Sequence, residues 1–271
     1  MSGRLVVCPT PIGNLEDVTL RVLAALRDAD VVACEDTRRT RILLDRYGVK
    51  ARLVSYYEHN ERERAPQLVA RMADGEVVAL VSDAGMPLVS DPGYVLLQAA
   101  VAAGLPVEVL PGPSAAMTAL VASGLPPERW RFVGFLPRRK VDLRELLSGE
   151  AGTLVAFESP RRVPATLELA AEIDAARPVV VCRELTKAHE EVVRGSAAEL
   201  AERFRDAPPK GEVVLVLGPA SATEDEAGSR GLEALRQLVD AGARPRDAAK
   251  VVAGLTGSSA NELYRSLTSS R

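Results

Sequence analysis

The chain has 271 residues, of which 47% are hydrophobic and 26% are charged, and its formal net charge is −3. This length exceeds the common size of one domain and predicts about two domains with sizeable cores. The slightly acidic balance excludes a uniformly basic nucleic-acid binder but leaves room for a local basic face. No apolar run approaches the roughly 20 residues that span a bilayer, and MSGRLVV lacks the layout of a secretory signal, so we expect a cytoplasmic protein without membrane contact.

Short apolar runs alternate with helical patterns over residues 1–122, which we predict to form a first domain. The runs cover residues 4–8, 30–34, 52–56, 76–81 and 106–110. They lack polar alternation, as is typical of parallel strands covered on both faces. This pattern predicts an α/β fold built from βαβ units.

The segment SGLPPERW (123–130) interrupts this rhythm and is expected to link two domains. A second domain over 123–219 follows, with apolar runs at 131–135, 152–157, 178–182, 191–195 and 212–217. The short spacing before the run at 191–195 leaves no room for a crossover helix, so the second sheet should include antiparallel pairing.

The last part of the chain has a different character. Residues 220–230 (ASATEDEAGSR) are small and acidic, which predicts a linker. Residues 231–271 carry three short helical patterns, with Leu235, Val251 and Leu255 among the apolar positions expected to be buried. Two interpretations stay open: a helix-turn-helix-like segment that contacts nucleic acid, or a plain helical cap.

Three loops rich in Gly and Pro follow three predicted strands, at 9–17, 82–93 and 111–116. Because ligands of open α/β sheets bind at the carboxyl ends of the strands, we expect these loops to converge on one site. Ser114 opens a helix whose N-terminus suits a carboxylate, and Asp83 and Asp91 add acceptors for hydroxyl or amino groups. Alternatively, Asp and Ser only cap turns.

Other familiar chemistries have no sequence support. The chain contains no G-x-x-x-x-G-K-[ST] motif, and no G-x-G-x-x-G follows a predicted strand. The two histidines, His59 and His189, lack zinc spacing, and we expect no metal site. Three cysteines stand far apart in apolar runs, which favours reduced core cysteines over disulfides.

Eight motifs, in order, carry a family resemblance. They are PTPIGNLEDVTLR, CEDTRRT, YYEHNE, SDAGMPLVSDPG, LPGPSAAMTAL, SGLP with GFLPRRK, FESPRR and CRELTKAHEE. This series resembles the ribosomal RNA small subunit methyltransferase I group of the tetrapyrrole methylase superfamily, over nearly the whole chain. The resemblance implies two αβα domains of the class III methyltransferase type, S-adenosyl-L-methionine in the interdomain cleft, and a C-terminal helix-turn-helix-like segment. It also implies a homodimer that methylates the ribose 2′-hydroxyl of a decoding-site cytidine in 16S rRNA of the small ribosomal subunit.

The same resemblance assigns cofactor contacts to matched loop positions. They are Gly13, Asp83, Ala84, Gly85, Pro87, Ser114 and Ala115, with Phe157, Leu185 and Gly211 as partners from the second domain. Two positions depart from the family pattern. Met86 stands where Thr is common, which puts one cofactor contact in doubt, and Arg161 stands where His is common, which puts a role of that side chain in doubt.

A ribose hydroxyl is a poor nucleophile, so methyl transfer needs positioning together with a base or a cation near the oxygen. The candidates are Glu158, Glu184, Lys187 and His189, at or just after strand ends of the second domain. Their alternative interpretation is a set of ordinary surface ion pairs.

Basic clusters are candidates for phosphate contact, with a solvated helix face as the alternative. They contain Arg38, Arg39, Arg138, Arg139 and Lys140. Tyr56, Tyr57, His59 and Asn60 either stack on an unpaired base or pack between domains. Two other functions remain open: methylation of a small tetrapyrrole-like substrate, and a non-enzymatic nucleic-acid-binding protein with a ligand-sensing α/β body.

Overall fold

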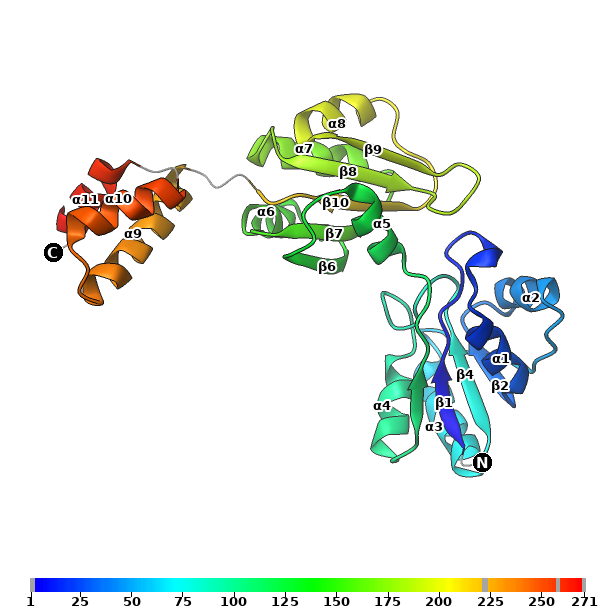
Figure 1. Ribbon diagram of the computed structural model, residues 1–271. Coiled ribbons are helices and arrows are strands. Elements are labelled where there is room, and N and C mark those ends of the chain that lie inside the picture. Colours follow the sequence, from blue (N-terminus) through cyan, green and yellow to red (C-terminus); the bar gives the residue numbers. More distant parts are fainter. Residues whose placement is uncertain (1–2, 221–223, 257–258, 270–271) are drawn as a thin grey trace. The chain divides into compact units, whose positions relative to one another are not determined.

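The computed structural model describes residues 3–220, 224–256 and 259–269. The chain forms two compact units, Met1–Pro219 and Ala220–Arg271. The larger unit carries two five-stranded sheets, and the smaller unit is helical. Each unit is described separately below (Figure 1).

The first sheet is parallel throughout and has the strand order β3-β2-β4-β1-β5. Its strands are β1 (Arg4–Val7), β2 (Val31–Cys34), β3 (Leu53–Ser55), β4 (Val77–Val81) and β5 (Val107–Val109). Each of the five apolar runs in this part of the sequence contains one strand. The prediction of parallel strands covered on both faces is confirmed.

Helices cover both faces of the first sheet, as Figure 1 shows. They are α1 (Leu20–Asp28), α2 (Thr37–Arg46), α3 (Glu61–Ala73) and α4 (Tyr94–Ala102), with the short 3-10 helix η1 (Leu15–Asp17) before α1. Val6 and Cys8 share a core cluster with residues of α1 and α2. Leu5 and Val7 point the other way and share a cluster with residues of α3 and α4. Alternate side chains along β1 therefore pack into two separate cores, one on each face of the sheet.

The second sheet is mixed, with the order β6-β7-β10-β8-β9. Its strands are β6 (Trp130–Phe135), β7 (Thr153–Glu158), β8 (Pro178–Arg183), β9 (Glu191–Ser196) and β10 (Val213–Leu217). Only β6 and β7 pair in parallel, and β8 and β9 form the expected antiparallel pair.

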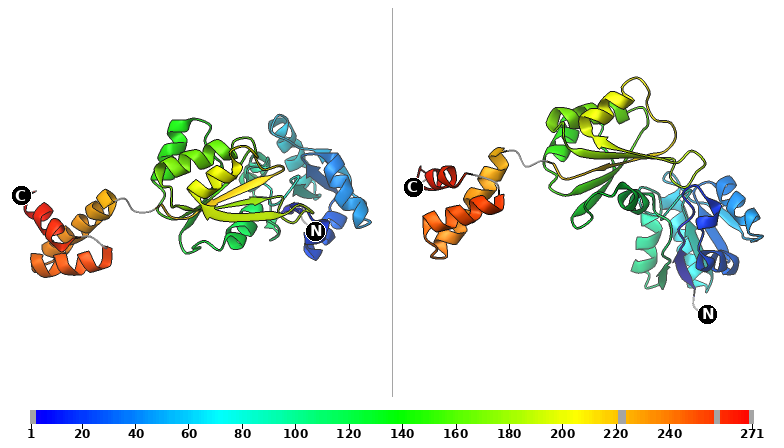
Figure 2. Two further views of the ribbon diagram at one scale, coloured as in Figure 1. Left: turned by 90° about the horizontal axis from the view of Figure 1, so that it is seen from above. Right: turned by 45° about the horizontal axis from the view of Figure 1, so that its top comes forward.

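Three helices cover one face of this sheet: α6 (Lys140–Ser148), α7 (Val163–Ile173) and α8 (Ala197–Phe204). Both views of Figure 2 show α7 and α8 side by side over the strands. Helix α8 begins with a capping box: the Ser196 hydroxyl accepts from the Glu199 N–H, and the Glu199 carboxylate accepts from the Ser196 N–H.

Helix α5 (Ala115–Ser123) covers the other face of the second sheet, although the sequence places it in the first predicted domain. Its buried residues Ala116, Ala119 and Leu120 pack against β7, β8 and β10. Arg194 of β9 donates to the carbonyls of Ala122 and Ser123 and so caps the C-terminus of α5. The domain limits 1–122 and 123–219 remain a prediction, but α5 packs with the second sheet.

The smaller unit contains α9 (Glu224–Asp240), α10 (Pro245–Thr256) and α11 (Ala260–Ser269). Its core is formed by Leu235, Ala248, Ala249, Val252 and Leu263. Val251 and Leu255 are exposed, contrary to the expectation that they share the buried face. Three helices account for the periodic pattern, while contact with nucleic acid stays a prediction.

The linker expected at 220–230 is shorter, because α9 begins at Glu224. Residues 221–223 of that segment lie outside the described part of the chain. Among the described residues, no helix is long and apolar enough to cross a membrane.

Candidate active site

The three Gly/Pro loops of the first sheet meet at its carboxyl edge, as predicted. The Thr10 N–H donates to the Gly85 carbonyl at 2.8 Å, and the Gly85 N–H donates back to Thr10 at 2.9 Å. The Thr10 hydroxyl also donates to the Ser82 carbonyl at 3.0 Å. A Cβ at Gly112 would overlap the Pro9 ring, so the loop after β5 packs directly on the loop after β1.

A cavity of about 460 Å³ opens beside these loops, a size that suits a small organic ligand. The first-sheet side and the start of α5 contribute Ile12, Ala84, Gly85, Met86, Val89, Ser90, Asp91, Ser114 and Ala115. The second-sheet side contributes Phe135, Phe157, Glu158, Ser159, Pro160, Gly211, Glu212, Val213 and Val214. Both sheets of the larger unit therefore build one site.

Six of the ten predicted cofactor residues line this cavity: Ala84, Gly85, Ser114, Ala115, Phe157 and Gly211. Ser114 caps α5, accepting a hydrogen bond from the Met117 N–H through its side chain. The N-terminus of α5 thus opens at the cavity, where its free N–H groups favour a carboxylate or another anion.

Asp83 does not line the cavity. One of its carboxylate oxygens accepts from the Asp36 N–H at 3.0 Å, and the other lies 3.5 Å from the Arg39 guanidinium. This side chain joins the loop after β4 to the start of α2. Pro87 is buried and also lies outside the cavity lining.

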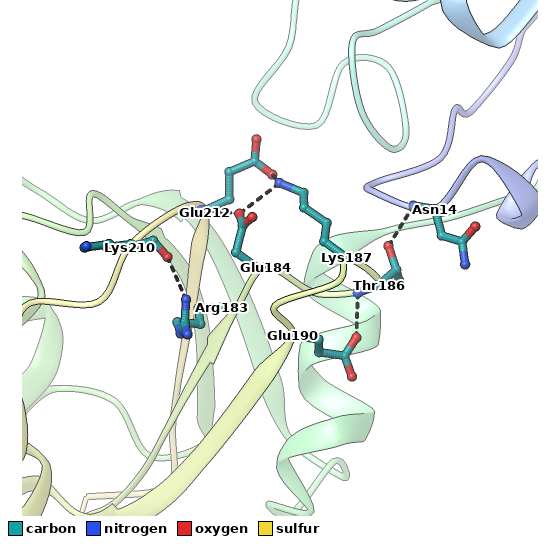
Figure 3. A network of polar contacts seen from close by, with 8 residues as sticks. All are labelled: Asn14, Arg183, Glu184, Thr186, Lys187, Glu190, Lys210 and Glu212. Atoms are coloured by element: carbon teal, nitrogen blue, oxygen red, sulfur yellow. Dashed lines mark hydrogen bonds and ion pairs between the residues drawn. The ribbon is translucent and has the colours of Figure 1, made fainter.

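Gly13 and Leu185 contact protein instead of the cavity. A Cβ at Gly13 would collide with the side chains of Lys187 and Thr186. The neighbouring Asn14 N–H donates to the Thr186 hydroxyl at 3.1 Å (Figure 3). Leu185 is buried in a cluster with Ile12 and α5. Glycine at position 13 therefore lets the loop after β1 approach the turn between β8 and β9.

That turn carries two of the predicted catalytic residues, Glu184 and Lys187. The Lys187 ammonium bridges Glu184 at 2.9 Å and Glu212 at 3.0 Å (Figure 3). Burial alone lowers the pKa of Lys187, but the two carboxylates outweigh burial and hold this pKa above its usual value. Hydrogen bonds from the Glu212 N–H and from Lys187 lower the pKa of Glu184. Lys187 is thus held as a cation and Glu184 as a weak base.

Gly211 has φ +85°, and a Cβ there would overlap the Glu184 carboxylate. Glycine at this position therefore makes room for the ion-paired Glu184 as well as lining the cavity. His189 lies exposed on the same turn and is not among the cavity residues.

Glu158 lines the cavity but is fully engaged elsewhere. Its carboxylate accepts from the Ser159 N–H at 2.7 Å and the Thr166 hydroxyl at 2.8 Å, and it lies 3.4 Å from Arg162. Arg162 in turn donates to the carbonyls of Leu136 and Pro137. Glu158 thus holds the loop between β6 and α6, and the geometry gives it no free oxygen for a catalytic proton.

Asp91 also lines the cavity, although it is not among the cofactor-binding or catalytic residues that the sequence analysis assigns. Burial raises its pKa to about 6, and the nearby carboxylates of Glu35 and Asp83 act in the same direction. A hydrogen bond from the Ser82 hydroxyl opposes this rise. The SDPG signal marked Asp91 as an acceptor in the sequence, but it did not distinguish Asp91 from Asp83.

Aromatic side chains form one wall of the cavity. Phe157 packs edge to face with Phe132 at 5.0 Å and with Phe135 at 5.5 Å between ring centroids. Phe135 is 64% exposed, although it lines the cavity. A bulge in β6 between Phe132 and Phe135, with Gly134 at φ +66°, turns its side chain in this direction. The wall suits a flat ring.

The predicted RNA-binding residues are all exposed, and most carry an ion pair. Arg38 pairs with Asp36, Arg39 with Asp83, Arg139 with Asp142 and Lys140 with Glu172. Exposed pairs of this kind are weak, so they leave these cations available to phosphate. In the part of the chain that the structure describes, Arg138 and Arg161 have no ion pair, and each lies within three residues of a cavity residue, Phe135 or Pro160.

Of the aromatic candidates near β3, Tyr56 is a core residue whose hydroxyl accepts from the Leu96 N–H. Tyr57 remains partly exposed and packs edge to face with His59. Among the described residues, no group of three or more His, Cys, Asp or Glu side chains is arranged to hold a metal.

Comparison with known proteins agrees with this fold. The family model described as Tetrapyrrole (Corrin/Porphyrin) Methylases matches residues 4–201, and the chain belongs to this family. A solved structure of uroporphyrin-III C-methyl transferase from Thermus thermophilus, complexed with S-adenosyl homocysteine, has a TM-score of 0.58 at 22% identity. The alignment covers 80% of this chain and 97% of that chain.

More similar relatives bear one name, Ribosomal RNA small subunit methyltransferase I. The relative from Mesorhizobium japonicum is 45% identical over 268 residues, covering 97% of this chain and 90% of the relative. The relative from Escherichia coli O157:H7 is 40% identical over 269 residues, covering 97% and 94%. The match extends through the helical unit at the end of the chain.

Proposed function

We propose that this protein transfers a methyl group from S-adenosyl-L-methionine to the ribose 2′-hydroxyl of a decoding-site cytidine in 16S rRNA of the small ribosomal subunit. The observation that carries the proposal is the 45% identity, over 97% of the chain, to a relative named Ribosomal RNA small subunit methyltransferase I. The cavity supports it, because its lining matches the parts of the cofactor.

The residues present fit S-adenosyl-L-methionine. The N-terminus of α5 at Ser114 suits the carboxylate of its amino-acid part. The Gly85 backbone allows close approach, and the ring of Phe157 offers apolar surface for an adenine. The cofactor supplies an electrophilic methyl group on a positively charged sulfur. The protein's share of the reaction is to hold the reactants in line and to exclude water.

An RNA substrate explains the basic residues beside the cavity. Arg138, Arg139 and Lys140 follow the exposed ring of Phe135, and Arg161 follows Pro160. Cations that contact phosphates beside a pocket with an aromatic wall suit a nucleotide whose base has left its stack. Arg38 and Arg39 add positive charge at the start of α2.

A small tetrapyrrole-like substrate would not account for the basic residues beside the cavity. The smaller helical unit supports the RNA substrate for the same reason, since Arg244, Arg246 and Lys250 lie on or beside α10. Their contact with RNA, and the need for an assembled subunit, are parts of this proposal.

We also propose a homodimer. Helix α5 is apolar on all sides, yet Met117 and Val121 are 47% and 79% exposed. Val109 of the edge strand β5 is 57% exposed. A helix that is hydrophobic all round is normally buried, so a second copy of the chain is a suitable cover for these residues.

A methyl-transfer assay tests the function directly. The purified protein is incubated with methyl-labelled S-adenosyl-L-methionine and, separately, with unmethylated small subunits, naked 16S rRNA and a tetrapyrrole precursor. We expect label on a cytidine ribose after nuclease digestion. Label only on the tetrapyrrole, or no label despite tight cofactor binding, would overturn the proposal in favour of the small-substrate methylase or the non-enzymatic binder.

A matched pair of variants shows whether the cavity is the site. Ala84→Trp fills the cavity and should abolish both cofactor binding and transfer, because Ala84 is part of the lining. Ala102→Trp places the same side chain on the exposed end of α4 and should change neither. Equal binding by both variants would move the cofactor to another part of the molecule.

A further inference from the structure

Three carboxylates line the cavity: Asp91, Glu158 and Glu212. Glu158 accepts from Ser159 and Thr166 and lies beside Arg162. Glu212 holds the Lys187 ammonium at 3.0 Å. Both are therefore committed to contacts within the protein, and their oxygens are poor acceptors for a proton from a ligand.

Asp91 has different surroundings. Its neighbours are the Ser82 hydroxyl and the carboxylates of Glu35 and Asp83, and Arg39 pairs with Asp83. Within the described ranges, no cation forms an ion pair with Asp91. Across the cavity the charged lining residues are Glu158 and Glu212, so no cation of the lining neutralises Asp91. A carboxylate in partial burial among like charges holds a proton more tightly than an exposed one.

The loop that carries Asp91 is rigid and strained. Leu88 has φ 73° and Ser90 has φ 68°, a region that side chains other than glycine rarely adopt. Pro87 and Pro92 restrict the backbone on either side. Gly93, at φ 135°, leaves room for the side chains of Leu80 and Leu88. Strain of this kind persists where the surrounding structure holds a functional group in place.

Contact with the second sheet fixes the other side of this loop. A Cβ at Gly134 would lie 3.3 Å from the Ser90 hydroxyl, so the bulge of β6 that turns Phe135 into the cavity packs on the residue before Asp91. The same contact therefore positions the aromatic wall and Asp91, the carboxylate of the cavity lining that has no ion pair among the described residues.

We propose that Asp91 is a catalytic residue that accepts the proton of the ribose 2′-hydroxyl during methyl transfer. This assignment rests on the proposed function. In the step, the 2′-oxygen forms a bond to the methyl carbon, and the carbon–sulfur bond breaks with its electron pair remaining on sulfur. The hydroxyl proton moves to an Asp91 carboxylate oxygen and is later released to water. A base with a pKa near the working pH combines a useful ionised fraction with useful basicity.

The test uses the full-length protein with Asp91→Asn, Asp91→Glu and the control Asp74→Asn at the exposed end of α3. We expect Asp91→Asn to slow single-turnover methyl transfer roughly 100-fold or more, as is common for loss of a general base. Asp91→Glu should restore part of the rate. Wild-type rates should fall as the pH drops below about 6, because the protonated carboxyl cannot accept the proton.

Two further readouts separate chemistry from binding. Affinity for S-adenosyl homocysteine, measured by calorimetry, should change less than about threefold in Asp91→Asn if the carboxylate acts in the chemical step, a change well below the 100-fold loss of rate. Carbon-13 NMR of aspartate-labelled protein without ligand should show a carboxyl that titrates near pH 6 and disappears in Asp91→Asn.

The outcomes are distinct. If wild type labels no RNA, the proposed function fails. If wild type labels RNA and Asp91→Asn is equally fast, the role of Asp91 fails while the function stands. Loss of cofactor affinity in proportion to the loss of rate would assign Asp91 to cofactor binding and overturn its role as proton acceptor.

Discussion

Replacing Asp91 by Asn should stabilise the protein at neutral pH. In the folded protein the pKa of this carboxyl rises from 3.8 to about 6, mainly through burial. At 1.36 kcal/mol per pKa unit, the difference corresponds to about 3 kcal/mol. Because the side chain is only half-buried, solvent screening reduces our expectation to about 1–2 kcal/mol.

The sign of the effect follows from proton linkage. Between pH 4 and 6 the folded protein holds a proton on Asp91 that the unfolded chain has lost, so the free energy of unfolding decreases as the pH rises through this range. Above pH 6 the Asp91 carboxylate is ionised in the folded protein as well, and its buried charge lowers the free energy of unfolding by the full amount. Asparagine carries no charge, so Asp91→Asn should exceed wild type in stability by the full amount at pH 7.5 and match it near pH 4.

Urea unfolding followed by circular dichroism at both pH values measures this difference. Asp74→Asn controls for the loss of one negative charge, because Asp74 is exposed at the end of α3. A difference between Asp91→Asn and wild type that is the same at pH 4 and pH 7.5 would refute the reasoning. So would a variant that is less stable than wild type at pH 7.5, since the Asp91 charge would then stabilise the fold.

Three further changes test other parts of the site. Gly13→Ala should weaken cofactor binding at least tenfold in calorimetry, a cost of about 1.4 kcal/mol, because the new methyl group displaces Lys187, which pairs with the cavity residue Glu212. Charge reversal of Arg138 and Arg161 should lower kcat/KM for RNA at physiological salt and flatten its salt dependence by about 0.7 per lost phosphate contact, with unchanged cofactor affinity. Val121→Glu should halve the mass found by light scattering, because it places a charge in the proposed dimer interface.

Each of these changes has a matched control. Gly254→Ala adds a methyl group in α10 that would meet no described atom within 4 Å apart from its chain neighbours and the backbone of its own helix, and it should leave cofactor binding intact. Reversal of the exposed Lys50 and Arg52, before β3, removes equal charge away from the cavity lining. Val141→Glu changes an exposed apolar residue on α6 and should leave the mass unchanged. If the controls behave like the test variants, the effects are general and the corresponding proposals fail.

The sequence predicted the strands well because each strand is a continuous apolar run bounded by turn residues. It also placed the three Gly/Pro loops together, since parallel strands carry their following loops to the same edge. The partner of α5 was not predictable in this way. This helix is apolar on every side, so its periodicity does not indicate which sheet it covers.

The different positions of the two aspartates in the loop after β4 could not be predicted from the sequence. Asp83 and Asp91 both follow serine and both precede a small or rigid residue. Asp83 turns to the Asp36 N–H, whereas Asp91 lies at the cavity. The left-handed conformations of Leu88 and Ser90 separate the two, and these are set by tertiary packing against Gly93 and Gly134.

Two glycines of the site have a packing role beside the cofactor contact that the family resemblance implies for them. Gly13 makes room for Lys187, and Gly211 makes room for Glu184, which is the ion-pair partner of Lys187. The two glycines therefore lie at the two ends of one network that reaches from the loop after β1 to the start of β10. The turn in this network holds strain of its own, since Glu184 and Thr186 have positive φ values. At both positions, glycine therefore lets two segments of the protein approach each other closely.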